Sequence, residues 1–259
     1  MIYTTPEGTM KGLFLDILKQ NHTLIAGATG SGKSVVINGL ISTLLYRFPG
    51  SGAEQAQMIL IDPKRVELAQ YKNLPHTLYH AAGQNPEAWK TALEMACKIM
   101  DKRYTEMQRA GHRTYTGGDL YVFVDGWISI QSKYNIKRAE CISALLRLVS
   151  EGRPARVHVI LVTQVPKASV IPTEIRDNFT ARVALMTENK LQSRIIIDAP
   201  GCEEFPDPKK AGYALAWYCL PGNDRKLVKV PLIPDDELDR LVGWWEAQKK
   251  SSRIGFLHW

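Results

Sequence analysis

One octapeptide, Gly27-Ala28-Thr29-Gly30-Ser31-Gly32-Lys33-Ser34, constrains the fold more than any other segment of this chain. It matches G-x-x-x-x-G-K-S, follows an apolar run at residues 23–26 and opens a helical pattern at residues 33–46. The phosphate-binding form of this motif requires that order of strand, glycine-rich turn and helix. An ordinary glycine-rich turn is the alternative, and the order disfavours it. We therefore expect the loop to bind a nucleoside triphosphate, ATP with magnesium.

Each residue type in the loop has a chemical role. Glycines let the backbone wrap around phosphates and point its N–H groups inward, and the positive end of the following helix adds a favourable field. Lys33 is expected to pair with the β and γ phosphates, and the Ser34 hydroxyl to hold magnesium. The expected nucleotide-binding residues are Thr29, Gly30, Ser31, Gly32, Lys33, Ser34 and Val35.

Strand and helix patterns alternate along the chain. Short apolar runs rich in β-branched residues indicate buried strands at residues 23–26, 58–61, 121–124, 157–162 and 181–186. Helical patterns occupy residues 33–46, 86–109 and 137–151, and Asn85-Pro86 supplies a cap and first turn for the second. This alternation predicts an α/β fold with a mostly parallel central sheet and helices on both faces, with ligands at the carboxyl ends of the strands.

Composition sets the outer limits. The 259 residues suit one domain, 1–259, with a lead-in at 1–20 and a terminal helix at 234–250. The excess of 33 Lys and Arg over 26 Asp and Glu gives a net charge of +7, which is compatible with a polyanionic partner. Cys97, Cys141, Cys202 and Cys219 form no paired motif, and no apolar run is long enough for a bilayer. We expect a cytoplasmic protein without direct membrane insertion.

A second acid is needed at the end of a neighbouring strand to position the metal. Asp125 follows the run at residues 121–124 and is the expected magnesium residue, although capping of a strand end is an alternative role. The residue after it, where a water-activating ATPase usually has Glu, is Gly126. Another group then acts as base, or hydrolysis is slow, or the glycine is a substitution. Glu151 is a possible substitute, and a solvated helix-end glutamate is its alternative interpretation.

Thr163 and Gln164 follow the run at residues 157–162. A polar pair at the carboxyl end of a strand beside the nucleotide can sense the γ phosphate or hold water. We assign this role to Gln164.

These motifs together resemble the motor domain of the FtsK/SpoIIIE DNA translocases, in the FtsK/HerA branch of RecA-like ATPases. Besides the phosphate loop, the stretch Leu60-Ile61-Asp62-Pro63-Lys64-Arg65-Val66-Glu67-Leu68 carries the resemblance. Residues 100–104 are similar to the family's E-R-R-Y, residues 157–164 to I-H-L-V-L-A-T-Q, and residues 193–198 to S-R-T-I-L-D. The similarity runs from about residue 12 to about residue 248.

The resemblance implies a RecA-like fold and a ring, typically of six subunits, that encircles double-stranded DNA and moves along it by ATP hydrolysis. Family members place each ATP between two subunits, and the neighbour contributes an arginine. Arg182 occupies that position in this sequence. Its planar, permanently charged guanidinium suits the charge that spreads over a γ phosphate. A surface ion pair at the start of a strand is the alternative role.

DNA contacts in the family come from two pore-facing loops. By position, the first follows Gln164 and offers Lys167 and Ser169, and the second lies near residues 201–212 and offers Lys209 and Lys210. Lysines suit sequence-independent phosphate contacts, but they are also the residues most often solvated in loops. Arg194 is expected to line the pore or support the subunit interface.

Several departures from the family pattern bear on function. Gly126 and Trp127 replace the usual glutamate and a smaller aromatic residue, and Val165 replaces an arginine that often follows the T-Q pair. The family's membrane segments and DNA-reading winged helix have no counterpart here, so we expect separate partners to supply them. An ATP-driven DNA translocase is the first hypothesis. A poorly hydrolysing ATP-binding ring that couples or scaffolds DNA is the second, and a small-molecule kinase is disfavoured because D-P-K and T-Q would have no role.

Overall fold

Parallel strands form the centre of the structure, a computed structural model that describes residues 2–4, 10–12, 17–48, 56–132, 134–164, 171–220, 225–231 and 233–254. The main sheet has eight strands in the order β10-β9-β8-β3-β7-β6-β4-β5. Strands β8 to β5 in that order run parallel, whereas β9 and β10 are antiparallel to their neighbours. The predicted α/β fold with a mostly parallel sheet is confirmed.

The strands of the main sheet are β3 (His22–Ala26), β4 (Gln57–Asp62), β5 (Thr77–Ala82), β6 (Leu120–Asp125), β7 (Val157–Thr163), β8 (Ala181–Leu185), β9 (Tyr213–Cys219) and β10 (Arg225–Pro231). A separate antiparallel pair is formed by β1 (Ile2–Thr4) and β2 (Met10–Gly12). The helices are α2 (Lys33–Arg47), α3 (Pro86–Ala110), α4 (Trp127–Ile130), α5 (Arg138–Glu151), α6 (Thr173–Arg176), α7 (Lys190–Ile197), α8 (Pro208–Ala211) and α9 (Asp235–Ile254).

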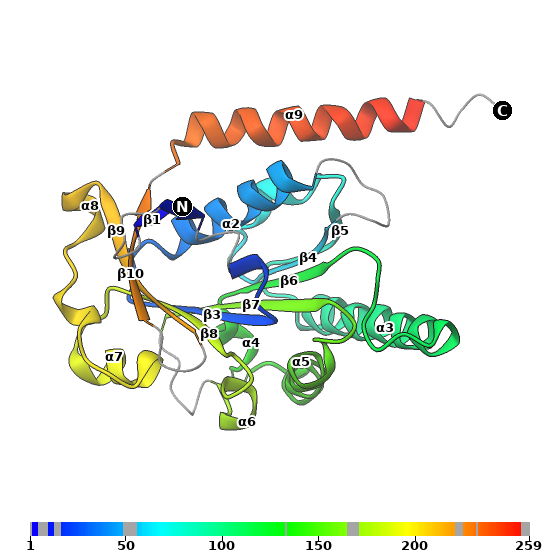
Figure 1. Ribbon diagram of the computed structural model, residues 1–259, viewed down its shortest axis with the longest axis horizontal. Coiled ribbons are helices and arrows are strands. Elements are labelled where there is room, and N and C mark those ends of the chain that lie inside the picture. The colour runs from blue at the N-terminus through cyan, green and yellow to red at the C-terminus, as the bar shows by residue number, and fades with distance from the viewer. Residues whose placement is uncertain are drawn as a thin grey trace.

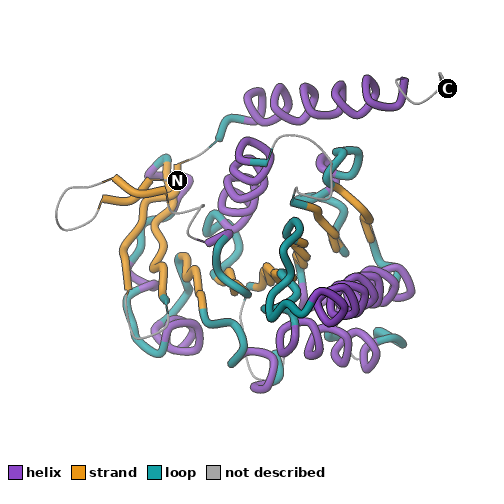
Figure 2. The backbone as a smooth tube through the Cα atoms, turned by 45° about the vertical axis from the view of Figure 1, so that its right-hand side comes forward, coloured by secondary structure: helices purple, strands orange, loops and turns teal. Residues whose placement is uncertain are grey.

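Helices cover both faces of the sheet. Figure 1 shows α2 and α9 above the strands and α3, α4 and α5 below them, and Figure 2 shows α3 and α5 side by side. The central strands are buried along their whole length because both faces are covered. This explains why they read in the sequence as continuous apolar runs.

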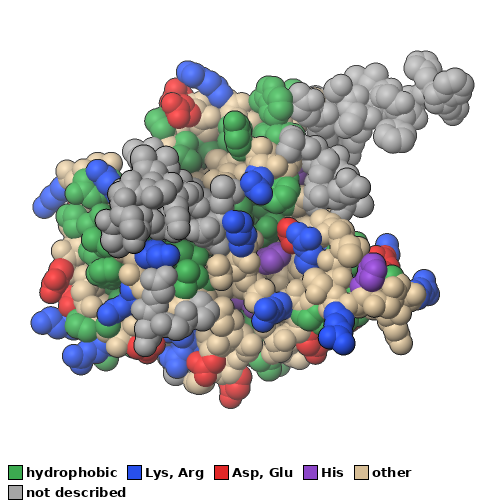
Figure 3. All heavy atoms as spheres, viewed as in Figure 1, with side chains coloured by type: hydrophobic (Ala, Val, Ile, Leu, Met, Phe, Trp, Pro, Cys, Tyr) green, Lys and Arg blue, Asp and Glu red, His purple; other side chains and the backbone are tan. Residues whose placement is uncertain are grey.

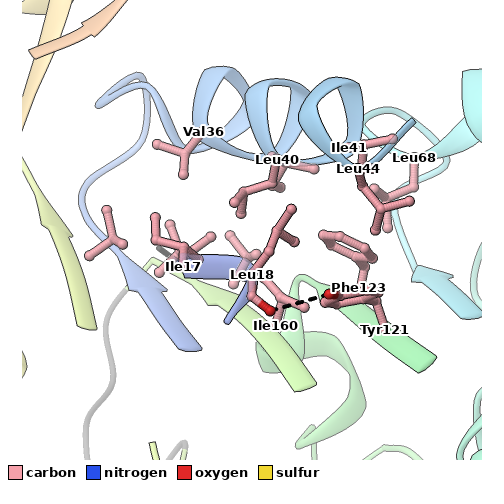
Figure 4. Packing of buried hydrophobic residues seen from close by; sticks show 14 of the residues in the cluster. Ile17, Leu18, Val36, Leu40, Ile41, Leu44, Leu68, Tyr121, Phe123 and Ile160 are labelled. Carbon is pink, nitrogen blue, oxygen red and sulfur yellow. Dashed lines mark hydrogen bonds between the residues drawn. The ribbon is translucent and has the colours of Figure 1, made fainter. Parts of the chain in front are cut away.

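The core on the α2 side holds the phosphate-loop helix against the sheet. Figure 4 shows the α2 side chains of Val36, Leu40 and Leu44 above Phe123 and its neighbours on the central strands. Apolar burial of this kind stabilises a fold by about 25 cal/mol per Å² removed from water. Tyr121 adds a hydrogen bond from its hydroxyl to the carbonyl oxygen of Leu18 at 3.2 Å.

Helix α3 begins and ends as its sequence predicts. The Asn85 side chain accepts a hydrogen bond from the main-chain N–H of Ala88 at 3.1 Å, and Pro86 occupies the first turn. The helix ends at Gly111, whose φ of 68° is the left-handed conformation that glycine adopts most easily. Among the described residues, no helix is both long and apolar enough to cross a membrane.

Three strands of the main sheet, β5, β9 and β10, have no counterpart in the sequence prediction. Strand β9 alternates between half-buried and buried residues, as a strand covered on one face does. Strand β5 lies at an edge of the sheet and is mostly half-buried. A search for uniformly apolar runs therefore finds the central strands and misses the edge strands β5 and β10 and β9, which neighbours β10.

Candidate functional site

The loop between β3 and α2 has a backbone that only glycine accommodates at its key positions. Gly32 has a φ of 98°, and a Cβ on it would lie 2.7 Å from the Cβ of Ala214. Gly30 is also left-handed, with a φ of 77°. The N–H of Ala28 donates to the carbonyl oxygen of Met186 at 2.8 Å, which fixes the loop to the end of β8.

The start of α2 is open to an anion. Gly32 is the cap residue, no side-chain cap hydrogen bond forms in the part of the chain that the structure describes, and the first turn contains no acidic residue. The first N–H groups of a helix have no partner within the helix, and the helix dipole places positive charge there. A phosphate group satisfies both requirements.

Lys33 lies inside the loop. Its Nζ donates to the main-chain oxygens of Gly27 at 2.8 Å and Ala28 at 2.6 Å. Burial lowers the pKa of Lys33 to about 8, and the nearby carboxylate of Asp125 opposes that shift. At pH 7 the side chain is therefore mostly cationic, which suits it for contact with phosphate oxygens.

Asp125 ends β6 as a buried carboxylate that receives no hydrogen bond from any described residue. Its exposed fraction is 7%. Burial raises the pKa of Asp125 to about 6, with Lys64 lowering it and the charges of Asp62 and Glu67 raising it. The charges of Lys64 and Lys33 favour the ionised carboxylate, but Asp125 forms no ion pair with any described residue, and a divalent metal would supply a direct partner.

A cavity of about 280 Å³ gathers the predicted nucleotide residues. Eight of them line it: Thr29, Gly30, Gly32, Lys33, Ser34, Val35, Asp125 and Gln164. Ser31 is fully buried, and its Oγ has no hydrogen-bond partner among the described residues. The Ser34 hydroxyl and the Asp125 carboxylate thus border one space, and both are ligand types that Mg²⁺ prefers.

Two further lining residues, Lys64 and Glu67, were not predicted as site residues. Both lie in the D-P-K-R-V-E-L stretch, which the sequence analysis used only as evidence of resemblance. The Asp62 carboxylate shapes this stretch by accepting hydrogen bonds from the N–H groups of Lys64, Arg65 and Leu68 at 3.1, 2.9 and 3.1 Å. Because β4 neighbours β6, the stretch opens beside Asp125.

A second cavity, of about 260 Å³, adjoins the first and shares Gly30, Gly32 and Val35 with it. Its remaining lining is mostly apolar, from Pro208, Lys209, Gly212, Tyr213, Ala214 and Val230. Apolar walls of this kind suit the flat faces of a heterocyclic base.

Gly126 has a left-handed backbone conformation that a glutamate at this position would rarely adopt. Its φ is 80°, and a Cβ on it would lie 3.7 Å from the Cε of Lys64. The possible substitute base, Glu151, lies at the end of α5, is exposed, and pairs with Arg147 at 3.2 Å. Because α5 leads into the amino end of β7, Glu151 lies away from the carboxyl ends that form the cavity.

Arg182 lies near the amino end of β8, paired in register with Leu24. It comes three positions before Leu185, so it is roughly 10 Å along the strand from the phosphate-loop end. Its guanidinium donates to the carbonyl oxygen of Ile196 at 2.9 Å and to the carboxylate of Asp198 at 3.3 Å. The structure therefore contains the ion pair named as the alternative role. Arg182 also lines a cavity of about 630 Å³ together with Arg225.

Of the predicted DNA-binding residues that the structure describes, Lys209 lines a cavity beside the nucleotide residues, whereas Lys210 and Arg194 line neither of the two cavities. Lys209 and Lys210 are exposed on the short helix α8, and Lys209 borders the apolar cavity. Arg194 is exposed on α7. Lys167, Ser169 and Val165 lie outside the described residues.

Comparison with known proteins gives a consistent result. The sequence model described as the FtsK/SpoIIIE family matches residues 3–204. "DNA translocase FtsK" of Mesorhizobium japonicum is 30% identical, over 92% of this chain and 30% of its own length. "DNA translocase FtsK" of Pseudomonas syringae pv. tomato is 30% identical, over 92% of this chain and 33% of its own length. The chain thus spans about a third of the length of these relatives.

Solved structures show the same fold. The pCW3 conjugation coupling protein TcpA, in its monomer form with ATPγS, superimposes with a TM-score of 0.72 at 20% identity, over 94% of this chain and 70% of that one. EssC (ATPases 2 and 3) from Geobacillus thermodenitrificans gives a TM-score of 0.76 at 15% identity, over 98% of this chain and 49% of that one.

Proposed function

This chain belongs to the FtsK/SpoIIIE family, and from that membership and the geometry of its site we propose that it is an ATP-driven motor acting on double-stranded DNA. The observation that carries the proposal is the single cavity lined by Lys33, Ser34, Asp125 and Gln164 at the open start of α2. Relatives whose names state DNA translocation support DNA as the substrate.

The nucleotide would occupy both adjoining cavities. Its phosphates would lie on the loop and at the start of α2, against Lys33, and its base would lie between Pro208 and Tyr213. Magnesium would be held by Ser34 and Asp125 and would neutralise charge on the β and γ phosphates. Gln164 would sense the γ phosphate. The ATPγS named with the TcpA structure is consistent with ATP as the ligand.

A ring, hexameric as is typical of the family, would complete the site. Arg182 lies at the other end of its strand from the phosphate loop of its own chain, so its guanidinium is available to a neighbour's nucleotide rather than to its own. The neighbouring nucleotide would compete with Asp198, whose side chain is 86% exposed, for the same guanidinium. An arginine so placed stabilises charge that develops on the transferred phosphoryl group.

DNA would be held by its phosphates. Lys209, Lys210, Arg194 and Lys167 remain the proposed contacts, and the net charge of +7 favours a polyanion. Lys209 is a proposed DNA contact and also borders the cavity proposed for the base. Helix α8 would therefore couple the nucleotide state to the affinity for DNA.

The test is phosphate release with and without double-stranded DNA. The motor predicts turnover that DNA stimulates and that Lys33→Ala abolishes, whereas Lys102→Ala, an exposed lysine on α3, leaves it unchanged. Gly126 favours a second candidate, a ring that binds ATP and DNA but scarcely hydrolyses ATP. Tight ATP binding with negligible turnover at saturating DNA would support that scaffold and contradict the motor.

A further inference from the structure

We propose that the Glu67 carboxylate is the general base that orients and deprotonates the attacking water. This inference rests on the proposed ATP hydrolysis. Hydrolysis forms a bond between the water oxygen and the γ phosphorus, and it breaks the bond from that phosphorus to the oxygen bridging the β phosphate. ADP leaves with the electron pair, and the water's proton passes to the base.

The chemistry of the cavity leaves few candidates for that base. Among the described residues that line it, Asp125 and Glu67 are the carboxylates. Asp125 would be occupied by magnesium, Lys33 is mostly cationic at pH 7, and the Gln164 amide has no basic site. Gly126 has no side chain at all. Glu67 is therefore the lining residue that can accept a proton while the others hold the nucleotide and metal.

The position of Glu67 is fixed from both sides. The Asp62 carboxylate accepts hydrogen bonds from the N–H group of Lys64, three residues before Glu67, and from that of Leu68, directly after it, at 3.1 Å each. After it, the Tyr71 hydroxyl donates to Asn38 on α2 at 2.9 Å, and the Tyr71 side chain is fully buried. A carboxylate held by rigid neighbours on a loop tied to the phosphate-loop helix keeps a constant geometry toward the nucleotide.

Glu67 itself is uncommitted. It is half-buried, and among the described residues its side chain forms no hydrogen bond or ion pair. Its charge reaches both Lys33 and Asp125, since it acts on the pKa of each. Glu67 lines the same cavity as Lys33 and Asp125, where a water that attacks the γ phosphate would have to bind.

The test compares Glu67→Gln, Glu67→Asp and Glu67→Ala with Glu106→Gln, a control on α3 whose carboxylate pairs with Lys102 at 3.9 Å. Binding of ATPγS and single-turnover hydrolysis of ATP are measured at saturating double-stranded DNA. We expect Glu67→Gln to lower the hydrolysis rate by about 100-fold or more while ATPγS affinity changes by less than about threefold. Glu67→Asp should retain partial activity, and Glu106→Gln should match the wild type.

Rescue separates a chemical role from a structural one. Added formate should raise the rate of Glu67→Ala by about tenfold and leave Glu67→Gln and the control unchanged, because a small carboxylate can replace the missing base. A wild-type enzyme that hydrolyses ATP, with Glu67→Gln equally fast, overturns the role of Glu67 and leaves the motor intact. The role of Glu67 is also overturned if the Glu67→Ala variant hydrolyses ATP slowly, binds ATPγS normally and shows no increase in rate with formate. A wild type that binds ATPγS without turnover overturns the motor and this inference together.

Discussion

The Nζ of Lys33 lies 2.6 Å from the main-chain oxygen of Ala28, so the cation that would meet a phosphate is already held by its own loop. A second carbonyl, that of Gly27, lies 2.8 Å away. The ammonium thus links two carbonyl groups of its own loop. The oxygens of an incoming triphosphate would share the Lys33 ammonium with these two carbonyls or replace them as acceptors. Their negative charge would also offset the cost of burying the ammonium.

Lys33→Met tests this arrangement. The folded pKa of Lys33, about 8, is below its ordinary value, so the charged form is disfavoured by folding at pH values below 8 and the penalty disappears as pH rises toward 10.5. We expect the melting temperature of the wild type to rise relative to that of Lys33→Met between pH 8 and pH 10. Nucleotide affinity of the variant should fall at least about 100-fold. A pH-independent difference would contradict the burial argument.

Asp125→Asn tests the metal role. The folded pKa of about 6 exceeds the ordinary value of 3.8, so the protonated Asp125 carboxyl contributes fully to stability below about pH 4. This contribution to the free energy of unfolding is lost as pH rises through 6. Without metal at pH 7.5, we expect Asp125→Asn to be more stable than the wild type, on the order of 2 kcal/mol. Magnesium should no longer increase nucleotide affinity in the variant. Calorimetric unfolding and binding with and without Mg²⁺ measure both effects.

Much of this site was predictable because its residues occupy the ends of buried strands. The loop, Asp125 and Gln164 each follow a continuous apolar run, and parallel strands bring their carboxyl ends to one edge. Glu67 was not predictable in this way, because it comes five residues after β4 in a loop shaped by Asp62. The hydrogen bonds of Arg182 to Ile196 and Asp198 also depend on how α7 folds back on β8, which no local pattern reports.

Gly126→Glu tests whether the site lacks a general base or whether Glu67 already serves as one. With a φ of 80°, any residue other than glycine at this position costs roughly 1 kcal/mol in backbone strain. If Glu67 already acts as base, the variant should lose stability and gain less than about twofold in turnover. Gly126→Ala measures the strain alone. A gain of tenfold or more in turnover for Gly126→Glu over Gly126→Ala would mean that the absent glutamate limits the wild type.

Lys209→Ala and Lys210→Ala separate two roles on α8. Each phosphate contact that is lost should weaken DNA binding across all sequences and reduce the magnitude of the salt dependence by about one unit of slope. Because Lys209 borders the apolar cavity, Lys209→Ala should also change nucleotide affinity, whereas Lys210→Ala should not. Titrations of labelled duplex at several salt concentrations check the first effect. Unchanged affinity and slope in both variants would remove α8 from the DNA interface.

The most direct test of the account mixes two defective subunits. Lys33→Ala would lack its own phosphate contact, and Arg182→Gln would fail to complete its neighbour's site while keeping a donor toward Ile196. Each variant alone should release little phosphate on duplex DNA. Mixed at equal amounts, they should recover up to about a quarter of the wild-type rate, because about that fraction of subunit boundaries joins an intact loop to an intact arginine. A mixture no faster than the average of its separate components, or an Arg182→Gln protein as fast as the wild type, would contradict a nucleotide site shared between two copies of this chain.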